Sequence, residues 1–230
     1  MDIREIVSEK ANSLLAGKTQ VKVLEAGCGS STHVNLLGVT AVVGIDISKE
    51  QLDLNNVLQE KILGDIQIYP LPKGEFDVAI CWMVLEHLPR PNDALLNIFS
   101  SLKPGGLAIL GFPNLQSFKG LVTKFTPYWF HESYYRFMKY KSHPFPTYLR
   151  AAILPKRLMR FAEENGFTVE FCRLEEGTVA KRFRKRFKIA DIAFSGVDSL
   201  TRFVTLGRAE SLQLDNCFLI LKKRGQEERL

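Results

Sequence analysis

Two acidic residues and two glycines near the amino terminus have the types and spacing of a ligand-binding turn. Glu25 ends an apolar run that starts at Val21, and Gly27 and Gly29 follow at alternate positions. Glycine lets backbone N–H groups approach a ligand closely and adopts positive φ at little steric cost. Asp46, 21 residues after Glu25, ends a second apolar run. An ordinary strand-to-helix turn would explain the glycines alone. Two strands joined through a glycine turn, the second ending in an acid, are typical of a nucleotide-binding βαβ unit.

The same residues resemble the first motif of the class I S-adenosylmethionine-dependent methyltransferases, an acid followed by Gly-x-Gly, with Ser31 where that family often has a third small residue. The resemblance implies that the glycine turn shapes the methionine end of S-adenosylmethionine and that Asp46 binds the ribose. It also implies that Asp65 reads the adenine amino group and that Ile66 packs on the purine. A solvated surface acid is the alternative for Asp65. The predicted cofactor-binding residues are Glu25, Gly27, Cys28, Gly29, Asp46, Ile47, Asp65, Ile66 and Trp82.

Two later segments extend the resemblance, which covers about residues 20–112. Phe76–Val84 is almost continuously apolar, as expected of a strand whose two faces are covered by helices, and Val84–Pro89 matches a signature of the family's small-molecule branch. Leu102–Gly106, at the end of a predicted helix, is another family signature. Enzymes that methylate DNA amino groups usually carry an Asn- or Asp-Pro-Pro-aromatic element after the fourth strand to hold an extruded base. This chain has none there.

Three histidines are the candidate catalytic residues: His87, His131 and His143. His87 lies at the predicted carboxyl end of a central strand, where ligands bind in open parallel sheets. It is either a general base or, as we favour, a structural residue that pins the loop over the cofactor. His131 and His143 either contact the substrate or are simply packed among aromatic residues. Because the sulfonium already activates the methyl group, catalysis can rest mainly on holding the acceptor close, with a base needed only for weakly acidic acceptors.

The expected fold is α/β and Rossmann-like: a seven-stranded, mostly parallel sheet with helices on both faces and an antiparallel last strand. Helices are expected over residues 2–16, from Ser31 or Thr32 to Leu37, from about Ser48, over Asn92–Leu102 and from Pro155. Further strands are expected over Lys61–Ile66, Leu107–Gly111, Phe167–Leu174 and Leu212–Lys222. The chain carries no repeat or low-complexity linker, so we expect one domain over residues 1–230.

Two segments depart from a minimal fold of this class. The first, residues 112–155, contains the stretch 118–148, which holds 11 of the 24 aromatic residues. This segment is a lid over an apolar substrate pocket, an interfacial membrane contact or a packed subdomain. The second, residues 175–211, contains Lys181–Lys188, with six basic residues in eight. A solvated helix face is one interpretation of that run, and contact with an anionic membrane surface is the leading specific one. Residues 115–190 carry 16 Lys and Arg against six acids, although the net charge of the whole chain is only +6.

Cysteine spacing and apolar runs indicate the compartment in which the protein is expected. The four cysteines are far apart, which predicts a reducing compartment and no metal site, and Cys28 is more readily a small filler of the turn than a redox group. No apolar run approaches the roughly 20 residues needed to span a bilayer, and the amino terminus lacks the layout of a secretory signal. We therefore expect a cytoplasmic protein, with peripheral membrane contact as an option. The residues do not indicate an oligomeric state.

The motifs favour S-adenosylmethionine-dependent methyl transfer to a small, partly apolar acceptor over several alternatives. An NAD-dependent oxidoreductase usually has Gly-x-Gly-x-x-Gly, and Thr32 occupies the third glycine position here. A methyltransferase acting on nucleic acid or protein is allowed by the basic run, although no base-flipping motif supports a nucleic-acid substrate. A non-catalytic S-adenosylmethionine-binding protein is the third alternative. The residues do not separate oxygen, nitrogen and carbon acceptors.

Overall fold

Seven strands form one sheet in the order β3-β2-β1-β4-β5-β7-β6. The computed structural model describes residues 1–117, 147–148, 150–177, 196, 199 and 214–225. The strands are β1 (Val21–Ala26), β2 (Val39–Asp46), β3 (Glu60–Leu63), β4 (Phe76–Trp82), β5 (Leu102–Pro113), β6 (Phe167–Glu175) and β7 (Asn216–Lys223). β1 to β5 pair in parallel, whereas β7 lies antiparallel between β5 and β6. The predicted seven-stranded sheet with an antiparallel last strand is confirmed.

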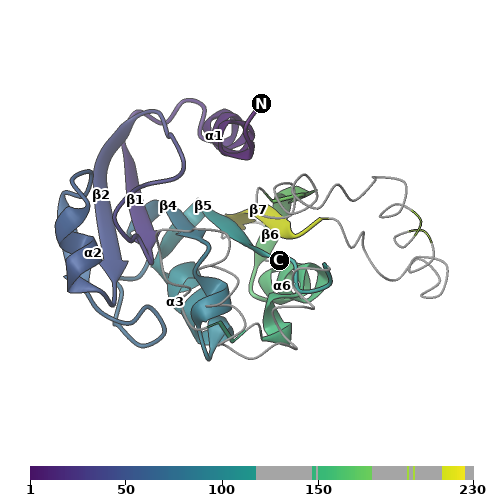
Figure 1. Ribbon diagram of the computed structural model, residues 1–230. Helices are drawn as coiled ribbons and strands as arrows, with labels where there is room; N and C mark the ends of the chain where they lie inside the picture. Colours follow the sequence, from purple (N-terminus) through teal and green to yellow (C-terminus); the bar gives the residue numbers. More distant parts are fainter. Residues whose placement is uncertain (118–146, 149, 178–195, 197–198, 200–213, 226–230) are drawn as a thin grey trace.

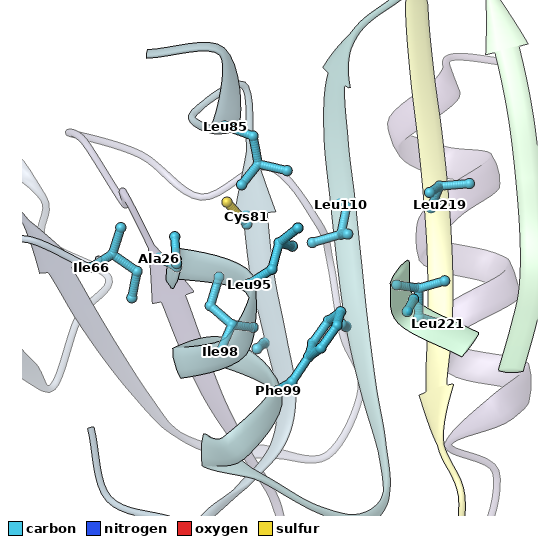
Figure 2. Packing of buried hydrophobic residues seen from close by; sticks show 14 of the residues in the cluster. Ala26, Ile66, Cys81, Leu85, Leu95, Ile98, Phe99, Leu110, Leu219 and Leu221 are labelled. Carbon is cyan, nitrogen blue, oxygen red and sulfur yellow. The ribbon is translucent and has the colours of Figure 1, made fainter. Parts of the chain in front are cut away.

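Helices cover both faces of this sheet, as predicted (Figure 1). Helices α1 (Ile3–Leu14) and α2 (Lys49–Leu54) pack on one face, and α3 (Pro91–Ser101) and α6 (Pro155–Glu164) pack on the other. In Figure 2, Leu95, Ile98 and Phe99 of α3 lie against side chains of β1, β4 and β5. The first six residues of β4 are buried, which explains its continuous apolar sequence.

The ends of these helices follow local sequence signals. Asp2 and Glu5 form a capping box at the start of α1, with the Asp2 carboxylate accepting from the backbone of Arg4 and the Glu5 carboxylate from the backbone of Asp2. Pro91 and Pro155 open α3 and α6, where a missing N–H costs no intrahelical hydrogen bond. The expected starts of these four helices at residue 2, Ser48, Asn92 and Pro155 lie within one residue of the observed starts.

The helix expected after the glycine turn, up to Leu37, is absent, and that prediction was wrong. Residues 30–38 contain no helix. Their backbone is held instead by α1: the Asn35 N–H donates to Ser8 Oγ (3.0 Å), the Leu37 N–H donates to Asn12 Oδ1 (2.9 Å), and Asn12 Nδ2 donates to the Asn35 carbonyl (3.1 Å). These side-chain partners replace the hydrogen bonds that a helix would supply. Residues 30–38 therefore present no helix N-terminus to the glycine turn.

Some strand boundaries also differ from the expectation. β3 ends at Leu63, so Asp65 and Ile66 lie in the loop after it. β5 begins at Leu102, five residues earlier than expected. β4 ends at Trp82 because Met83 has a φ of +55°, which breaks the extended conformation. Such a φ is uncommon for a residue other than glycine and is often found at functional sites.

An ion cluster stabilises the sheet at the amino end of β4, whereas the glycine turn lies at the carboxyl end of the neighbouring β1. Asp77, 4% exposed, accepts from Lys18 Nζ (2.9 Å), Lys103 Nζ (2.7 Å) and the backbone N–H of Lys22 (3.1 Å). Burial alone would raise the pKa of Asp77, but these hydrogen bonds and the charge of Lys18 hold it below its ordinary value of 3.8.

We expect Asp77→Asn to lower the free energy of unfolding by about 1–3 kcal/mol at pH 7, because three donors lose a charged acceptor. A carboxyl with a lowered native pKa stabilises the fold above its unfolded pKa and loses this contribution as the pH falls through its native pKa. The difference from the wild type should therefore shrink below about pH 4. Urea denaturation at several pH values measures it, with the exposed Asp53→Asn as control. A constant difference down to pH 2 would contradict the assignment.

A buried junction lies where β5 ends and β7 begins. Asn114 donates its N–H to the Asp215 carbonyl (2.8 Å) and its side-chain amide to the Leu214 carbonyl (2.9 Å). The Gly177 N–H, just beyond β6, donates to the Asp215 carboxylate. Asn114 and Asp215 are at most 1% exposed. Most of the predicted aromatic lid, and all of the basic run Lys181–Lys188, lie outside the described residues.

Candidate functional site

The glycine turn after β1 is held from two sides. The N–H groups of Gly27 (2.8 Å) and Cys28 (3.2 Å) donate to the Ile45 carbonyl in β2, and Asn55 Nδ2 donates to the Gly29 carbonyl (3.2 Å). Gly27 has a φ of +70° and Gly29 a φ of +50°. A Cβ at Gly27 would lie 2.4 Å from the nearest methyl carbon of Val84, which follows β4. Gly27 therefore requires glycine for both its backbone conformation and its packing.

The Asp46 carboxylate connects this turn to the end of β2. One oxygen accepts from the N–H of Gly29 (2.9 Å) and the other accepts from the N–H of Ser48 (2.8 Å). The side chain is partly exposed, and each carboxylate oxygen has a second lone pair. Asp46 can therefore hold the turn and still accept from a ligand.

Glu25 is a buried carboxyl group directly before the turn. It is 3% exposed and has no hydrogen bond to its side chain within the residues that the structure describes. Burial raises the pKa of Glu25 from 4.5 to about 8, so the group is mainly protonated at neutral pH. Such a carboxyl is suited to a cationic ligand group, which would restore its charge.

The predicted adenine-contacting residues lie at the neighbouring strand ends. The Asp65 carboxylate accepts from the backbone N–H (2.9 Å) and the side-chain amide of Gln67. Ile66 is 4% exposed and packs in the core beside Ala26 (Figure 2), whereas Ile47, next to Asp46, is 76% exposed. Of the two isoleucines, Ile47 offers the larger free apolar surface.

Cys28 fills space inside the turn. Its sulfur lies 2.8 Å from where a Cβ of Gly44 would stand, and the side chain is buried. Burial, followed by the charges of Asp46 and Glu25, raises the pKa of Cys28 to about 12. A thiol that stays protonated is a poor redox group, which agrees with the packing interpretation.

Trp82, at the end of β4, contacts two aromatic rings. Its centroid is 5.9 Å from that of His33, with the ring planes 26° apart, and 4.8 Å from that of Phe218 in β7. His33 belongs to the segment 30–38 and was not among the predicted site residues. The sequence signal for His33 was its position, four residues after Gly29 in the ligand-binding turn. The helix wrongly predicted for this segment hid that signal.

The predicted catalytic histidines are placed only in part. His87 ends the short 3-10 helix Leu85–His87 after β4, and its Nε2 lies 3.8 Å from Glu86 Oε1. His131 and His143 lie outside the described residues, so their roles stay predictions. The described residues contain no group of three side chains able to hold a metal ion and no helix long and apolar enough to cross a bilayer.

Comparison with known proteins agrees with this geometry. Residues 24–110 match the model of a methyltransferase domain. Over 160 residues the chain is 29% identical to the mitochondrial ubiquinone biosynthesis O-methyltransferase of Schizosaccharomyces pombe. This match covers 64% of this chain and 55% of that protein. The chain is 26% identical over 153 residues to the ubiquinone biosynthesis O-methyltransferase of Coxiella burnetii. This match covers 63% of this chain and 62% of that protein.

A solved structure shares the fold at lower identity. The SAM-dependent methyltransferase of Archaeoglobus fulgidus superposes with a TM-score of 0.55 at 18% identity, over 96% of this chain and 94% of that one. The chain spans about half the length of the first curated relatives it matches. Together, the motif order, the sheet topology and the family match show that residues 24–110 are similar to a methyltransferase domain of class I, a family that uses S-adenosyl-L-methionine as its cofactor.

Proposed function

We propose that this chain transfers the methyl group of S-adenosylmethionine to a hydroxyl group of a small, partly apolar molecule. The observation that carries the proposal is the set of three acids, Glu25, Asp46 and Asp65, at or just beyond the carboxyl ends of the adjacent strands β1, β2 and β3. A turn with glycine at positions 27 and 29, and with the Cys28 side chain buried, lies beside the first two of them. The choice of an oxygen acceptor is supported by the curated relatives, which are named O-methyltransferases.

The residues of this site fit S-adenosylmethionine. The buried carboxyl of Glu25 suits the ammonium group of the methionine end, because it has no hydrogen-bond partner among the described residues. Asp46 has free lone pairs for ribose hydroxyls, and the exposed Ile47 and the Asp65 carboxylate suit the adenine. The cofactor supplies a methyl group on a positively charged sulfur. The protein's part is to hold both partners and to exclude water.

A transfer assay tests the proposal and separates it from its alternatives. The full chain is incubated with methyl-labelled S-adenosylmethionine and, in parallel, with simple phenols and catechols, bulk RNA, or a protein mixture. We expect label in a phenol or catechol methyl ether and none with Asp46→Ala. Label in RNA or protein instead would overturn the proposal in favour of a macromolecular substrate. Binding of S-adenosylhomocysteine without any transfer would favour a non-catalytic binding protein.

Cofactor binding should release a proton from Glu25. Because the pKa of Glu25 is raised in the native state, ionisation of this carboxyl opposes folding. The free energy of unfolding of the ligand-free protein therefore falls as the pH rises from 4.5 toward 8. An ammonium group beside the carboxyl lowers its pKa, so the carboxyl loses its proton on binding. We expect the heat of S-adenosylhomocysteine binding at pH 6.5 to depend on the ionisation enthalpy of the buffer and to report release of close to one proton.

The matched variant is Glu25→Gln, which keeps the shape of the side chain and cannot ionise. Its binding heat should be the same in phosphate and in Tris buffer. A buffer-independent heat for the wild type would contradict the assignment of Glu25.

The membrane-surface contact remains a proposal from the sequence. It rests on the basic run Lys181–Lys188 with Phe183 and Phe187 at helical spacing. These residues lie outside the described part of the chain. A partly apolar acceptor is consistent with such a surface.

A further inference from the structure

His33 is a half-buried imidazole at the carboxyl ends of the parallel strands, where the proposed cofactor site lies. It follows the glycine turn by four residues, and its ring stacks on Trp82 at the carboxyl end of β4. Trp82 is fixed by Phe218 on β7 and lies over Gly111 of β5, where a Cβ would be 3.0 Å from the indole. The aromatic contact fixes the orientation of the imidazole.

The backbone that carries His33 is also fixed. Val34, the next residue, is 6% exposed and packs with the core on the α1 face of the sheet. The hydrogen bonds of Asn35 and Leu37 to Ser8 and Asn12 hold the following residues to α1. The imidazole is therefore positioned by two independent elements, α1 and β4.

Both ring nitrogens of His33 are available for a ligand. Within the described ranges, neither one forms a hydrogen bond to the protein. Burial, and then the positive charge of Arg4 on α1, lowers the pKa of His33, so the ring is neutral at pH 7. Arg4 itself lies 3.4 Å from the Asp2 carboxylate, and Trp82 and Phe218 bring no charge to the ring. A neutral imidazole offers one N–H donor and one lone pair.

We propose that His33 is a catalytic residue that accepts the proton of the acceptor's hydroxyl group, an inference that rests on the proposed function. The O–H bond breaks and its proton goes to the imidazole lone pair. The acceptor oxygen uses the freed electron pair to bond the methyl carbon, and the electrons of the broken carbon–sulfur bond stay on sulfur. The imidazolium then gives its proton to water. The acceptor class is a weakly acidic hydroxyl, such as a phenol.

Two phenols of different acidity test this role. Phenol, with a pKa of about 10, is protonated at pH 8, whereas 4-nitrophenol, with a pKa of about 7, is mostly ionised. His33→Phe keeps a ring against Trp82 and removes both nitrogens. We expect His33→Phe to lower kcat/KM for phenol by about 10²- to 10³-fold and for 4-nitrophenol by less than about threefold. An equal loss on both phenols would show a structural role and overturn the proposal.

A binding experiment gives a readout that does not depend on turnover. In the complex with S-adenosylhomocysteine, NMR of ring-labelled histidine identifies the His33 signal by its absence in His33→Phe. We expect phenol to shift that signal, and we expect His33→Phe to bind S-adenosylhomocysteine as the wild type does. If no phenol shifts it, the proposal is overturned. If the signal shifts but the wild type transfers no methyl group, the contact with His33 stands and the proposed function fails separately.

Discussion

Asp46→Ala is expected to reduce the affinity for S-adenosylhomocysteine by at least about 100-fold, or about 3 kcal/mol. The carboxylate has two tasks that the variant removes together. It is the proposed partner of the ribose hydroxyls, and it accepts hydrogen bonds from the N–H groups of Gly29 (2.9 Å) and Ser48 (2.8 Å). Without it, the turn loses a fixed contact on the side that faces β2.

Isothermal titration calorimetry measures this effect, and two further variants locate its cause. Asp46→Asn keeps one oxygen acceptor and should give an intermediate loss of affinity. Asp53→Ala, on the exposed side of α2, removes an acid that pairs with Lys49 and should leave the affinity unchanged. Wild-type affinity in Asp46→Ala, with the fold intact by circular dichroism, would remove Asp46 from the binding site.

Gly27→Ala is expected to abolish measurable binding of S-adenosylhomocysteine and to lower the free energy of unfolding by about 2–3 kcal/mol. An alanine at a φ of +70° is strained, and its Cβ would lie 2.4 Å from a methyl carbon of Val84. Either the turn or the segment after β4 must move, and both border the proposed cofactor site.

Two variants separate the contribution of strain from that of the steric clash. Gly74→Ala introduces a Cβ at a φ of +62° with no atom within 4 Å, so it should cost stability through strain and leave binding intact. Adding Val84→Ala to Gly27→Ala removes the clash and should recover part of the stability and affinity. Thermal melting and calorimetry give both quantities. Undiminished binding by Gly27→Ala would refute the proposed close packing of turn and ligand.

The sequence predicted those parts of the fold whose causes are local. Pro155 marks a helix start, and the uninterrupted apolar run of β4 indicates a strand buried on both faces. The acids at the strand ends were found because their spacing in a βαβ unit is regular. The family match over residues 24–110 covers the acids at the strand ends, β4 and α3.

Interactions between distant residues were not predictable in this way. Ser31 and Thr32 followed by apolar residues are typical of a capped helix. The hydrogen bonds that hold this segment come instead from Ser8 and Asn12, which lie 23 to 27 residues before the backbone groups that they bind. The contact between His33 and Trp82 joins two segments that are about 50 residues apart. No periodic pattern within either segment indicates it, which is why His33 was missed.

The junction of Asn114, Asp215 and Gly177 separates the register of the sheet from the stretches that interrupt it. The chain passes through it on leaving β5, on leaving β6 and on entering β7, and its hydrogen bonds use backbone groups and two buried side chains. The stretches 118–146 and 178–213 each begin within a few residues of this junction. Insertions or deletions within them need not alter the register of β5 against β7. The pairing of β5 with β7 is therefore anchored by described residues on both sides of these two stretches.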